Sequence, residues 1–262
     1  EIAQCLVGSE MCIRDRLCII NVMEIYGNIN SEESMGLVDG PGIRYVVFMQ
    51  GCQLRCLYCH NPETWDKDKK CIQITPKQLI DKVKRFKSYY GNVGGITFSG
   101  GEPLLQPRFL LECLKLCKEN SINTALDTAG VGFGEYDEIL SLVDLVILDI
   151  KAVKEEDYKK LTGKPMKFFN KFLEDCQRLN KRLWLRQVIV PNLNDTEENI
   201  QNLSEFIKKI KNVEKVELLP YKTIGVHKYG DLGIKYRLDG VPDMDEQKCK
   251  KLEIKLISNL KN

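Results

Sequence analysis

GCQLRCLYCHN, residues 51–61, carries three cysteines at spacings of four and three positions: Cys52, Cys56 and Cys59. The stretch follows IRYVVF, residues 43–48, an apolar run that predicts a buried strand. Thiols this close together on a short loop cannot spread apart. We therefore expect the three side chains to converge on one bound group, with the rest of the chain arranged around it.

The spacing of the cysteines leaves three interpretations open. A structural zinc ion takes four ligands, usually from two separated pairs, so only His60 or the distant Cys71 could complete its set. A [4Fe-4S] cluster held by three cysteines keeps one iron without a protein ligand, and a small molecule can bind there. In the third interpretation the cysteines are free and only pack.

Composition limits the class of protein. The 262 residues are 43% hydrophobic, enough for one large α/β domain or two small ones. A net charge of +2 gives no indication of a nucleic-acid partner. The 11 cysteines are not spaced as a disulfide framework, which favours a reducing, cytoplasmic setting. No apolar run approaches the ~20 residues that span a bilayer, so we expect no membrane partner.

Residues 1–22 differ from the rest of the chain. They show no helical or strand periodicity, and their apolar run at 17–22 is shorter than the ~7 to 15 residues of a signal-peptide core. The segment CLVGSEMCIRDR looks like a translated sequencing adapter. We therefore expect a non-native leader at 1–22, a native start at Met23 and a single domain over 23–262. A peptide of the natural protein from upstream of Met23, found by mass spectrometry, would contradict this.

From Met23 onward, apolar runs alternate with helical patterns. Six repeats of strand then helix predict a parallel sheet with right-handed crossovers. A short edge strand at 25–29 precedes them, and a glycine-rich loop at 225–243 precedes the last helix. The expected strands are 43–48, 94–99, 123–128, 145–150, 183–190 and 215–219, and the expected helices are 75–90, 107–120, 135–142, 155–161, 166–180, 196–211 and 244–260.

Polar side chains gather at the carboxyl ends of these strands, the face at which barrels of parallel strands bind ligands. Paired glycines such as Gly100 and Gly101 allow a ligand close to the backbone, although such a pair is more often a simple bend. Arg186, inside an apolar strand, must face a polar cavity or a partner. The residues in strand order are Cys52, Cys56 and Cys59, then Gly100, Gly101 and Glu102, then Asp127, then Asp149 and Lys151, then Arg186, then Tyr221 and Lys222.

Two further features have both a structural and a functional interpretation. Asp39, in the turn VDGPG ahead of the first main strand, is either a turn-stabilising residue or part of a site. Cys113 and Cys117, four residues apart on a predicted helix, are expected to pack as small apolar residues.

From Met23 to the last helix the chain resembles the radical S-adenosylmethionine (SAM) enzymes that activate glycyl-radical enzymes, and among them those that act on pyruvate formate-lyase. The resemblance implies a partial (β/α)6 barrel, α/β in class, with a parallel sheet open on one side for a protein substrate. It also implies a [4Fe-4S] cluster whose open iron chelates SAM. The motifs that carry it are VDGPG, GCQLRCLYCHNPETWD, SGGEP, LDT, LDIK, WLRQVIVP and ELLPYKTIG.

The resemblance also implies site residues. Cys52, Cys56 and Cys59 would hold the cluster. Gly100, Gly101 and Glu102 would bind the amino end of SAM, and Asp149, Lys151 and Arg186 would line the rest of its site. Asp127, Thr128 and Asp149 would coordinate a monovalent cation, and Asp39 and His60 would lie near the target peptide.

One position departs from the family. A histidine often contacts SAM after the sixth strand, where this chain has Lys222. Either Lys222 binds the ligand or His227 replaces the histidine, and otherwise His227 is a loop residue.

The implied reaction is reductive cleavage of SAM, followed by removal of a hydrogen atom from a glycine α-carbon of the partner, without a general acid or base. The expected partners are a glycyl-radical enzyme, pyruvate formate-lyase first among them, and flavodoxin or ferredoxin as electron donor, and we expect a monomer. Activators of other glycyl-radical enzymes often insert a ferredoxin-like unit with eight more cysteines, whereas only Cys71 lies between Cys59 and Cys113 here. Outside the class, the alternative is an iron-sulfur electron carrier or a metal-binding module.

Overall fold

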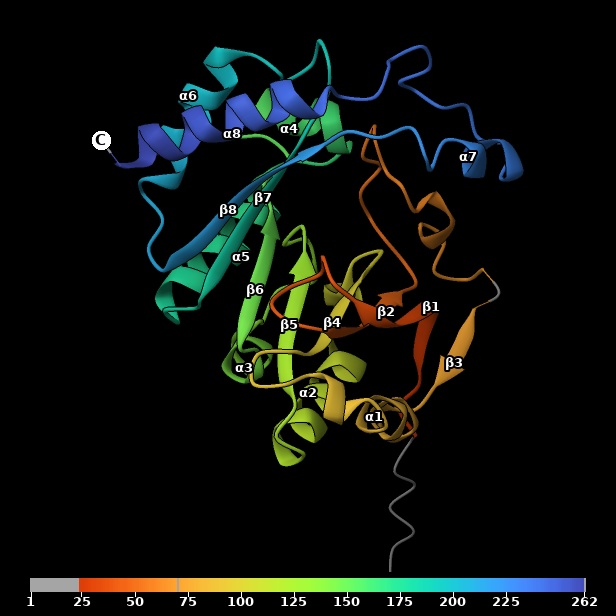
Figure 1. Cartoon of the computed structure of the whole chain (residues 1–262). Coiled ribbons are helices and arrows are strands. Elements are labelled where there is room, and N and C mark those ends of the chain that lie inside the picture. The colour runs from red at the N-terminus through yellow and green to blue at the C-terminus, as the bar shows by residue number, and fades with distance from the viewer. Residues whose placement is uncertain (1–23, 70, 262) are drawn as a thin grey trace, which may run out of the picture.

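An eight-stranded sheet organises the protein (Figure 1), in a computed structural model that describes residues 24–69 and 71–261. The strand order is β3-β1-β2-β4-β5-β6-β7-β8, in which β2 and β4 to β8 are parallel while β1 and β3 extend the sheet antiparallel. The strands are Gly27–Gly36 (β1), Arg44–Met49 (β2), Ile72–Ile74 (β3), Gly95–Gly100 (β4), Asn123–Thr128 (β5), Leu145–Asp149 (β6), Leu183–Ile189 (β7) and Val213–Pro220 (β8).

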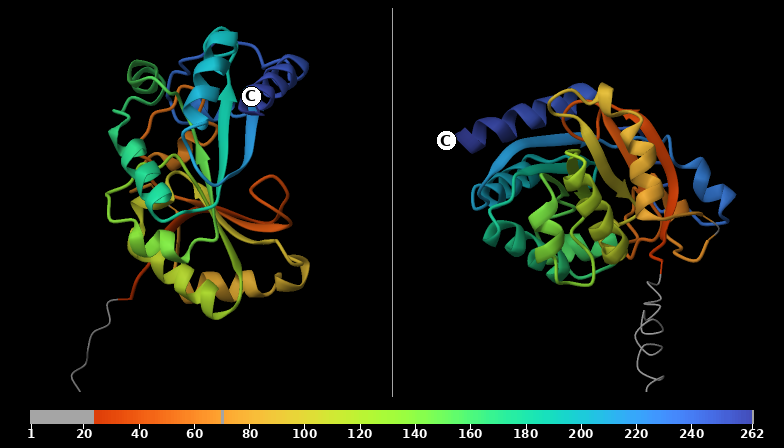
Figure 2. Two further views of the ribbon diagram at one scale, coloured as in Figure 1. Left: turned by 90° about the vertical axis from the view of Figure 1, so that its left-hand side faces the viewer. Right: turned by 90° about the horizontal axis from the view of Figure 1, so that it is seen from below.

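The described residues form eight α-helices, most of which pack around the sheet. Seen from below (Figure 2, right), the sheet curves into an arc whose edge strands are β3 and β8, so the barrel is open. Helices α1, α2 and α3 pack side by side, and α6 packs against α8, which also lies on β8. The helices are Pro76–Lys84 (α1), Pro107–Glu119 (α2), Asp137–Leu142 (α3), Glu155–Thr162 (α4), Lys167–Arg178 (α5), Glu197–Ile207 (α6), His227–Asp231 (α7) and Glu246–Lys261 (α8).

The predicted six parallel strands are confirmed, and the partial barrel with them. On α2 the side chains of Cys113 and Cys117 are fully buried beside Phe109 and Leu110, so the expectation that they pack in the core is confirmed. None of the described helices is long and apolar enough to cross a membrane. The prediction of a non-native leader falls on residues outside the described range.

Four elements differ from the sequence prediction. The edge strand expected at 25–29 is the longer β1, because β2 on one side and β3 on the other both pair with it. Strand β3 was not predicted, because it is only three residues long with Ile72 and Gln73 exposed and so lacks an apolar pattern. The loop 225–243 contains α7, and α1 ends at Lys84 rather than near Tyr90.

Arg44, the first residue of β2, lies fully buried at the amino end of the sheet. Its guanidinium donates to Thr97 Oγ1 at 3.0 Å, to Asn123 Oδ1 at 2.8 Å and to the carbonyl oxygens of Val93 and Ile96 at 3.1 and 2.5 Å. Burial lowers its pKa to about 10, which still leaves it charged at neutral pH. One cation therefore ties the first three parallel strands together at this end.

We expect Arg44→Met to lower the free energy of unfolding by about 3 kcal/mol, because several buried acceptors would lose their donor at once. Chemical denaturation monitored by circular dichroism measures this. Arg85→Met, at the exposed end of α1, is the matched control and should change stability by no more than ~0.5 kcal/mol. Equal stability of both variants would show that the network around Arg44 contributes little.

Candidate active site

Residues 51–61 form a loop that follows β2 and has almost no regular structure of its own. Backbone hydrogen bonds fix it to its neighbours. Arg55 and Leu57 donate to the carbonyls of Thr162 and Leu161 at the end of α4, at 2.8 and 3.0 Å. Gly51 donates to Thr64 at 2.7 Å. The main chain of other segments therefore holds the loop at its start and on either side of Cys56.

The three cysteine side chains line one cavity of about 410 Å³. The cavity lies where the parallel strands end, and parts of β4, β5, β6 and β8 also line it. The three cysteines thus share one cavity, and their convergence on one bound group stays a prediction. Of the other predicted site residues, the cavity is lined by His60, Gly100, Gly101, Asp127, Thr128, Asp149 and Lys151.

The thiols are in a setting that disfavours their charged form. All three are free, and burial raises the pKa of each, for Cys56 to about 11. Thiolate is the metal-ligating form, so positive charge from bound iron would be needed to stabilise it. Among the described residues no three His, Cys, Asp or Glu side chains stand close enough to hold a single metal ion. A four-iron cluster, by contrast, takes each cysteine on a different iron, and this donor set fits it.

Gly100 and Gly101 allow β4 to approach the cysteine loop. Gly100 has φ of +103°, and a Cβ there would meet the backbone nitrogen of Met49 at 2.3 Å. A Cβ on Gly101 would meet the carbonyl oxygen of Gly51 at 2.2 Å. These glycines are therefore required first for close packing of the two segments, and they line the cavity as well.

Glu102 lies behind the cavity wall. Its buried carboxylate accepts from Thr128 Oγ1 at 2.6 Å, Ala129 N at 3.0 Å and Leu104 N at 3.2 Å. Burial raises its pKa to about 7, although these donors favour the carboxylate. Glu102 is not among the residues that line the cavity, and its role at the amino end of SAM stays a prediction. Glu102 instead links the end of β4 to the end of β5.

Two carboxylates from neighbouring strands face the cavity. Asp127 accepts from Ser99 Oγ at 2.7 Å, and Asp149 pairs with Lys151 Nζ at 2.7 Å. Burial and the nearby Asp149 raise the pKa of Asp127 to about 6. Although burial opposes it, Asp149 raises the pKa of Lys151, which keeps that side chain charged. The hydroxyl of Thr128 donates to Glu102, and Thr128 lines the cavity together with both aspartates. Coordination of a monovalent cation by these three residues stays a prediction.

Arg186 is not among the residues that line the cavity. Its Nε donates to Glu217 Oε2 at 2.9 Å, and the two residues are register partners on β7 and β8. A second nitrogen donates to the carbonyl oxygen of Val38 at 2.6 Å, in the turn that also contains Asp39. The expectation that Arg186 needs a partner is confirmed. Asp39 is half-buried near it, and burial raises the pKa of that carboxyl.

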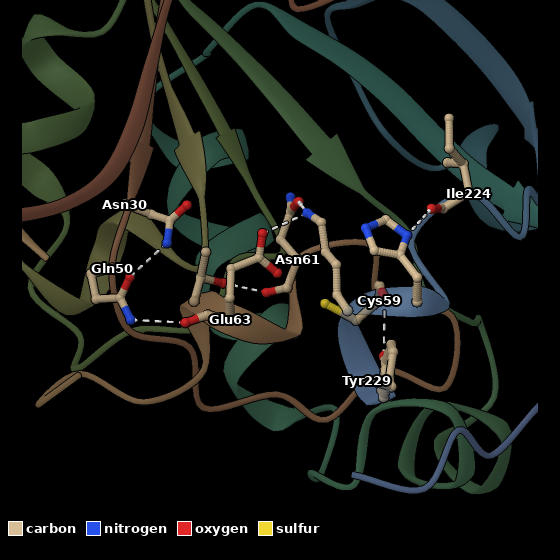
Figure 3. A network of polar contacts seen from close by, with 10 residues as sticks. Asn30, Gln50, Cys59, Asn61, Glu63, Ile224 and Tyr229 are labelled. Carbon is tan, nitrogen blue, oxygen red and sulfur yellow. Dashed lines mark hydrogen bonds and ion pairs between the residues drawn. The ribbon is translucent and has the colours of Figure 1, made fainter. Parts of the chain in front are cut away.

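The segment after β8 folds over the cysteine loop (Figure 3). His60 Nε2 lies 2.8 Å from the carbonyl oxygen of Lys222. Lys228 donates to Glu63 Oε1 at 2.5 Å and to Asn61 Oδ1 at 3.2 Å. Tyr229 donates to the carbonyl oxygen of Cys59 at 3.0 Å. We call residues 221–243 the strap.

The strap contains Lys222 and His227, the two candidates for the role of the family histidine, and that role stays a prediction for both. Lys222 Nζ pairs with Glu246 Oε1 at 2.6 Å, and His227 Nδ1 lies 3.0 Å from the carbonyl oxygen of Ile224. Neither side chain is among those that line the cavity, whereas His60 is. Sequence reasoning missed Lys228 and Tyr229, because they stand in a loop without periodicity, and only their spatial contacts identify them.

Comparison with known proteins agrees with this geometry. Residues 46–207 match the Radical SAM superfamily. The chain is 55% identical over 230 residues to the pyruvate formate-lyase-activating enzyme of Clostridium pasteurianum, covering 87% of this chain and 96% of that one. It is 42% identical over 232 residues to the enzyme of that name from Staphylococcus epidermidis, covering 86% of this chain and 92% of the relative.

Solved structures share the fold. A domain of a pyruvate-formate lyase-activating enzyme from Bacteroides vulgatus superposes with a TM-score of 0.51 at 24% identity, covering 64% of this chain and 93% of that one. Streptococcus suis SuiB bound to its precursor peptide superposes with a TM-score of 0.63 at 15% identity, covering 82% of this chain and 45% of SuiB. The fold and the cysteine cavity are those of a radical SAM enzyme, which uses a [4Fe-4S] cluster and SAM. At the identities found, the chain belongs to the family of the pyruvate formate-lyase-activating enzymes.

We expect Cys56→Ala to lose the cluster. After anaerobic reconstitution, iron and sulfide analysis should give about four of each per wild-type chain, as the [4Fe-4S] formula requires, and far less for the variant, because one anchoring thiolate is gone. Cys71→Ala, just before β3, is the control and should bind iron and sulfide as the wild type does. Loss of metal in Cys71→Ala would instead support a fourth ligand and a zinc site.

We expect Lys228→Met to release iron faster than the wild type when a chelator is added, because the strap would lose its contacts with Glu63 and Asn61. Since this ion pair is half-exposed, a few-fold increase in rate is expected. Lys235→Met, in the same segment but without an ion pair among the described residues, is the control. An unchanged release rate in Lys228→Met would mean that the strap does not support the loop.

Proposed function

We propose that this enzyme activates pyruvate formate-lyase. The observation that carries the proposal is 55% identity over nearly the full length of an activating enzyme, in a chain whose three thiols line one cavity. When bound, the reduced cluster would supply one electron that splits SAM into methionine and a 5′-deoxyadenosyl radical, and this radical would take a hydrogen atom from a glycine α-carbon of the partner to give 5′-deoxyadenosine.

The residues of this chain would bind, orient and shield the reactants. Cys52, Cys56 and Cys59 would hold the cluster, leaving its fourth iron toward the cavity. Backbone groups at Gly100 and Gly101 line the side on which the amino end of SAM would lie. Glu102 would act as a positioning residue, since its carboxylate holds the ends of two strands together.

The charged groups at the cavity fit the rest of SAM. Lys151, held by Asp149, presents a cation to the carboxylate of SAM, and Asp127 with Asp149 offers oxygen atoms to a monovalent cation. Arg186 supports this region from behind through Glu217. His60 lies at the exposed side of the cavity, which suits a contact with the target peptide, as does the half-buried Asp39.

The proposal extends to the setting of the enzyme. All described cysteines are free, which agrees with a reducing, cytoplasmic location. A flavodoxin or ferredoxin would supply the electron, and we propose that the enzyme acts as a monomer that meets its protein substrate at the open side of the barrel.

Two alternatives predict different outcomes. An activator of another glycyl-radical enzyme would cleave SAM but leave pyruvate formate-lyase unchanged. An iron-sulfur electron carrier would take up an electron without consuming SAM, and this would leave the polar residues at the strand ends without a role.

We expect the reduced, reconstituted protein to convert SAM to 5′-deoxyadenosine, and to produce the electron paramagnetic resonance doublet of a glycyl radical when pyruvate formate-lyase is added. Lys151→Met should raise the KM for SAM about tenfold or more, because a charge-assisted contact is lost. Lys181→Met, at a distance from the cavity, is the control. Failure to form 5′-deoxyadenosine on a full cluster would refute the proposal, and cleavage without a glycyl radical would favour a different partner enzyme.

A further inference from the structure

The electron must reach the cluster while SAM occupies the cavity. This requirement rests on the proposed function. SAM and the target peptide would fill the hollow at the strand ends, so a second protein cannot use the same approach at the same time. The reductant therefore needs a separate surface that still lies close to one of the cluster cysteines.

A second hollow meets this requirement. It has a volume of about 650 Å³ and lies on the outer side of the cysteine loop, where Gly51, Arg55 and Lys67 line it. It shares two lining residues with the cavity, Cys52 and Trp65. Cys52 thus borders both hollows, and a partner seated in the outer one is separated from the cluster site by little more than this residue.

The outer hollow is basic. Arg55, Lys67 and Lys164 line it, against one acidic residue, Asp68. Within residues 24–69 and 71–261 none of these three cations forms an ion pair, so their charges are available to a partner. Phe133 adds an apolar side chain that is 72% exposed at the same hollow.

Arg55 connects this surface to the cluster ligands. Its guanidinium donates to the carbonyl oxygens of Cys52 and Leu54, both at 2.8 Å, and lies 4.9 Å from the centre of the Trp65 ring. The same side chain therefore holds the backbone of a cluster cysteine and carries positive charge at the surface.

Another hollow of the molecule does not combine unpaired cations with a cluster cysteine. The groove between α4 and α6 is lined by Lys151, Lys154 and Lys160 together with Asp157 and Glu198. There Lys154 pairs with Glu198 and Lys151 with Asp149, so most of the charge is neutralised within the chain. No cluster cysteine lines that groove.

We propose that the basic hollow beside Cys52 is the docking site of an acidic one-electron carrier protein. A partner with a negative surface fits its charge, Phe133 offers an apolar contact at the rim, and the route from the carrier to the cluster passes through Cys52. Electron transfer moves one electron from the reduced carrier to the oxidised cluster, and no atom is transferred.

The test uses the reconstituted holoenzyme and a reduced flavodoxin of net negative charge. In Lys67→Glu/Lys164→Glu, stopped-flow absorbance should show cluster reduction by flavodoxin slowed about tenfold or more at low salt, because attraction is replaced by repulsion. High salt should bring the rates of variant and wild type together. Isothermal titration calorimetry with oxidised flavodoxin should show weaker binding, and reduction by dithionite should be unchanged.

Lys208→Glu/Lys261→Glu is the matched control. It makes the same change in charge at a hollow between β8 and α8, which no cluster cysteine lines. Equal slowing in both double variants, or none in the first, would overturn the proposed docking site. If dithionite and SAM give no 5′-deoxyadenosine, the proposed function fails instead, and that result is separate from the rate at which flavodoxin reduces the cluster.

Discussion

Backbone hydrogen bonds between residues 51–61 and neighbouring segments are the constraint on which the site depends. The loop has almost no helix or strand of its own to place its thiols. Hydrogen bonds from Arg55 and Leu57 fix it to the end of α4, and a hydrogen bond from Gly51 fixes it to Thr64. Because Tyr158 and Leu161 of α4 pack in the same hydrophobic core as the parallel strands, the core also helps to fix where the three cysteines lie. The antiparallel β1 adds to this, since it pairs with the full length of β2 just before the loop begins.

The same constraint explains why Gly100 and Gly101, at the end of β4, must be glycines. Glycines at a strand end are compatible with a ligand that approaches the backbone, and the cavity lining agrees with that. Their tighter requirement is internal, since any side chain at Gly100 or Gly101 would collide with the backbone of residues 48–51. Substitution there would displace the cysteine loop before it affected a bound ligand. A substitution at either position would therefore affect the packing of the cysteine loop and the binding of a ligand at the same time.

The sequence could predict the parts of the site that depend on strand order. Because side chains at the carboxyl ends of parallel strands meet, Asp127, Asp149 and Lys151 were expected together with the cysteines, and they line one cavity. Pairing across strands was harder to predict. Arg186 clearly needed a partner, but Glu217 stands 31 positions later in a strand whose other residues include exposed charges. Arg44 was overlooked because a single arginine at the start of an apolar run carries no periodic signal.

The strap illustrates the physical limit of such predictions. Its contacts with the cysteine loop join residues about 165 positions apart, through Lys228 and Tyr229. Lysine and tyrosine in a glycine-containing loop are compatible with many surface positions, so composition does not identify a role for them. The path of this segment follows from the sheet, because β8 is the last parallel strand and lies next to β7 and the site. After β8 the chain leaves the sheet there and crosses the cysteine loop before α8 returns to the outer face (Figure 1).

Charge in the cavity is balanced only in part by the protein. Lys151 offsets Asp149, and Arg186 is committed to Glu217, so Asp127 has the hydroxyl of Ser99 as its direct partner. A buried carboxylate of this kind is costly unless a cation or a proton accompanies it. The sulfonium of SAM and a monovalent ion are both cations, and the iron atoms would neutralise the three thiolates in the same space. The protein would thus supply anionic oxygen and sulfur atoms at this site, and its proposed cofactors would supply the positive charge that balances them.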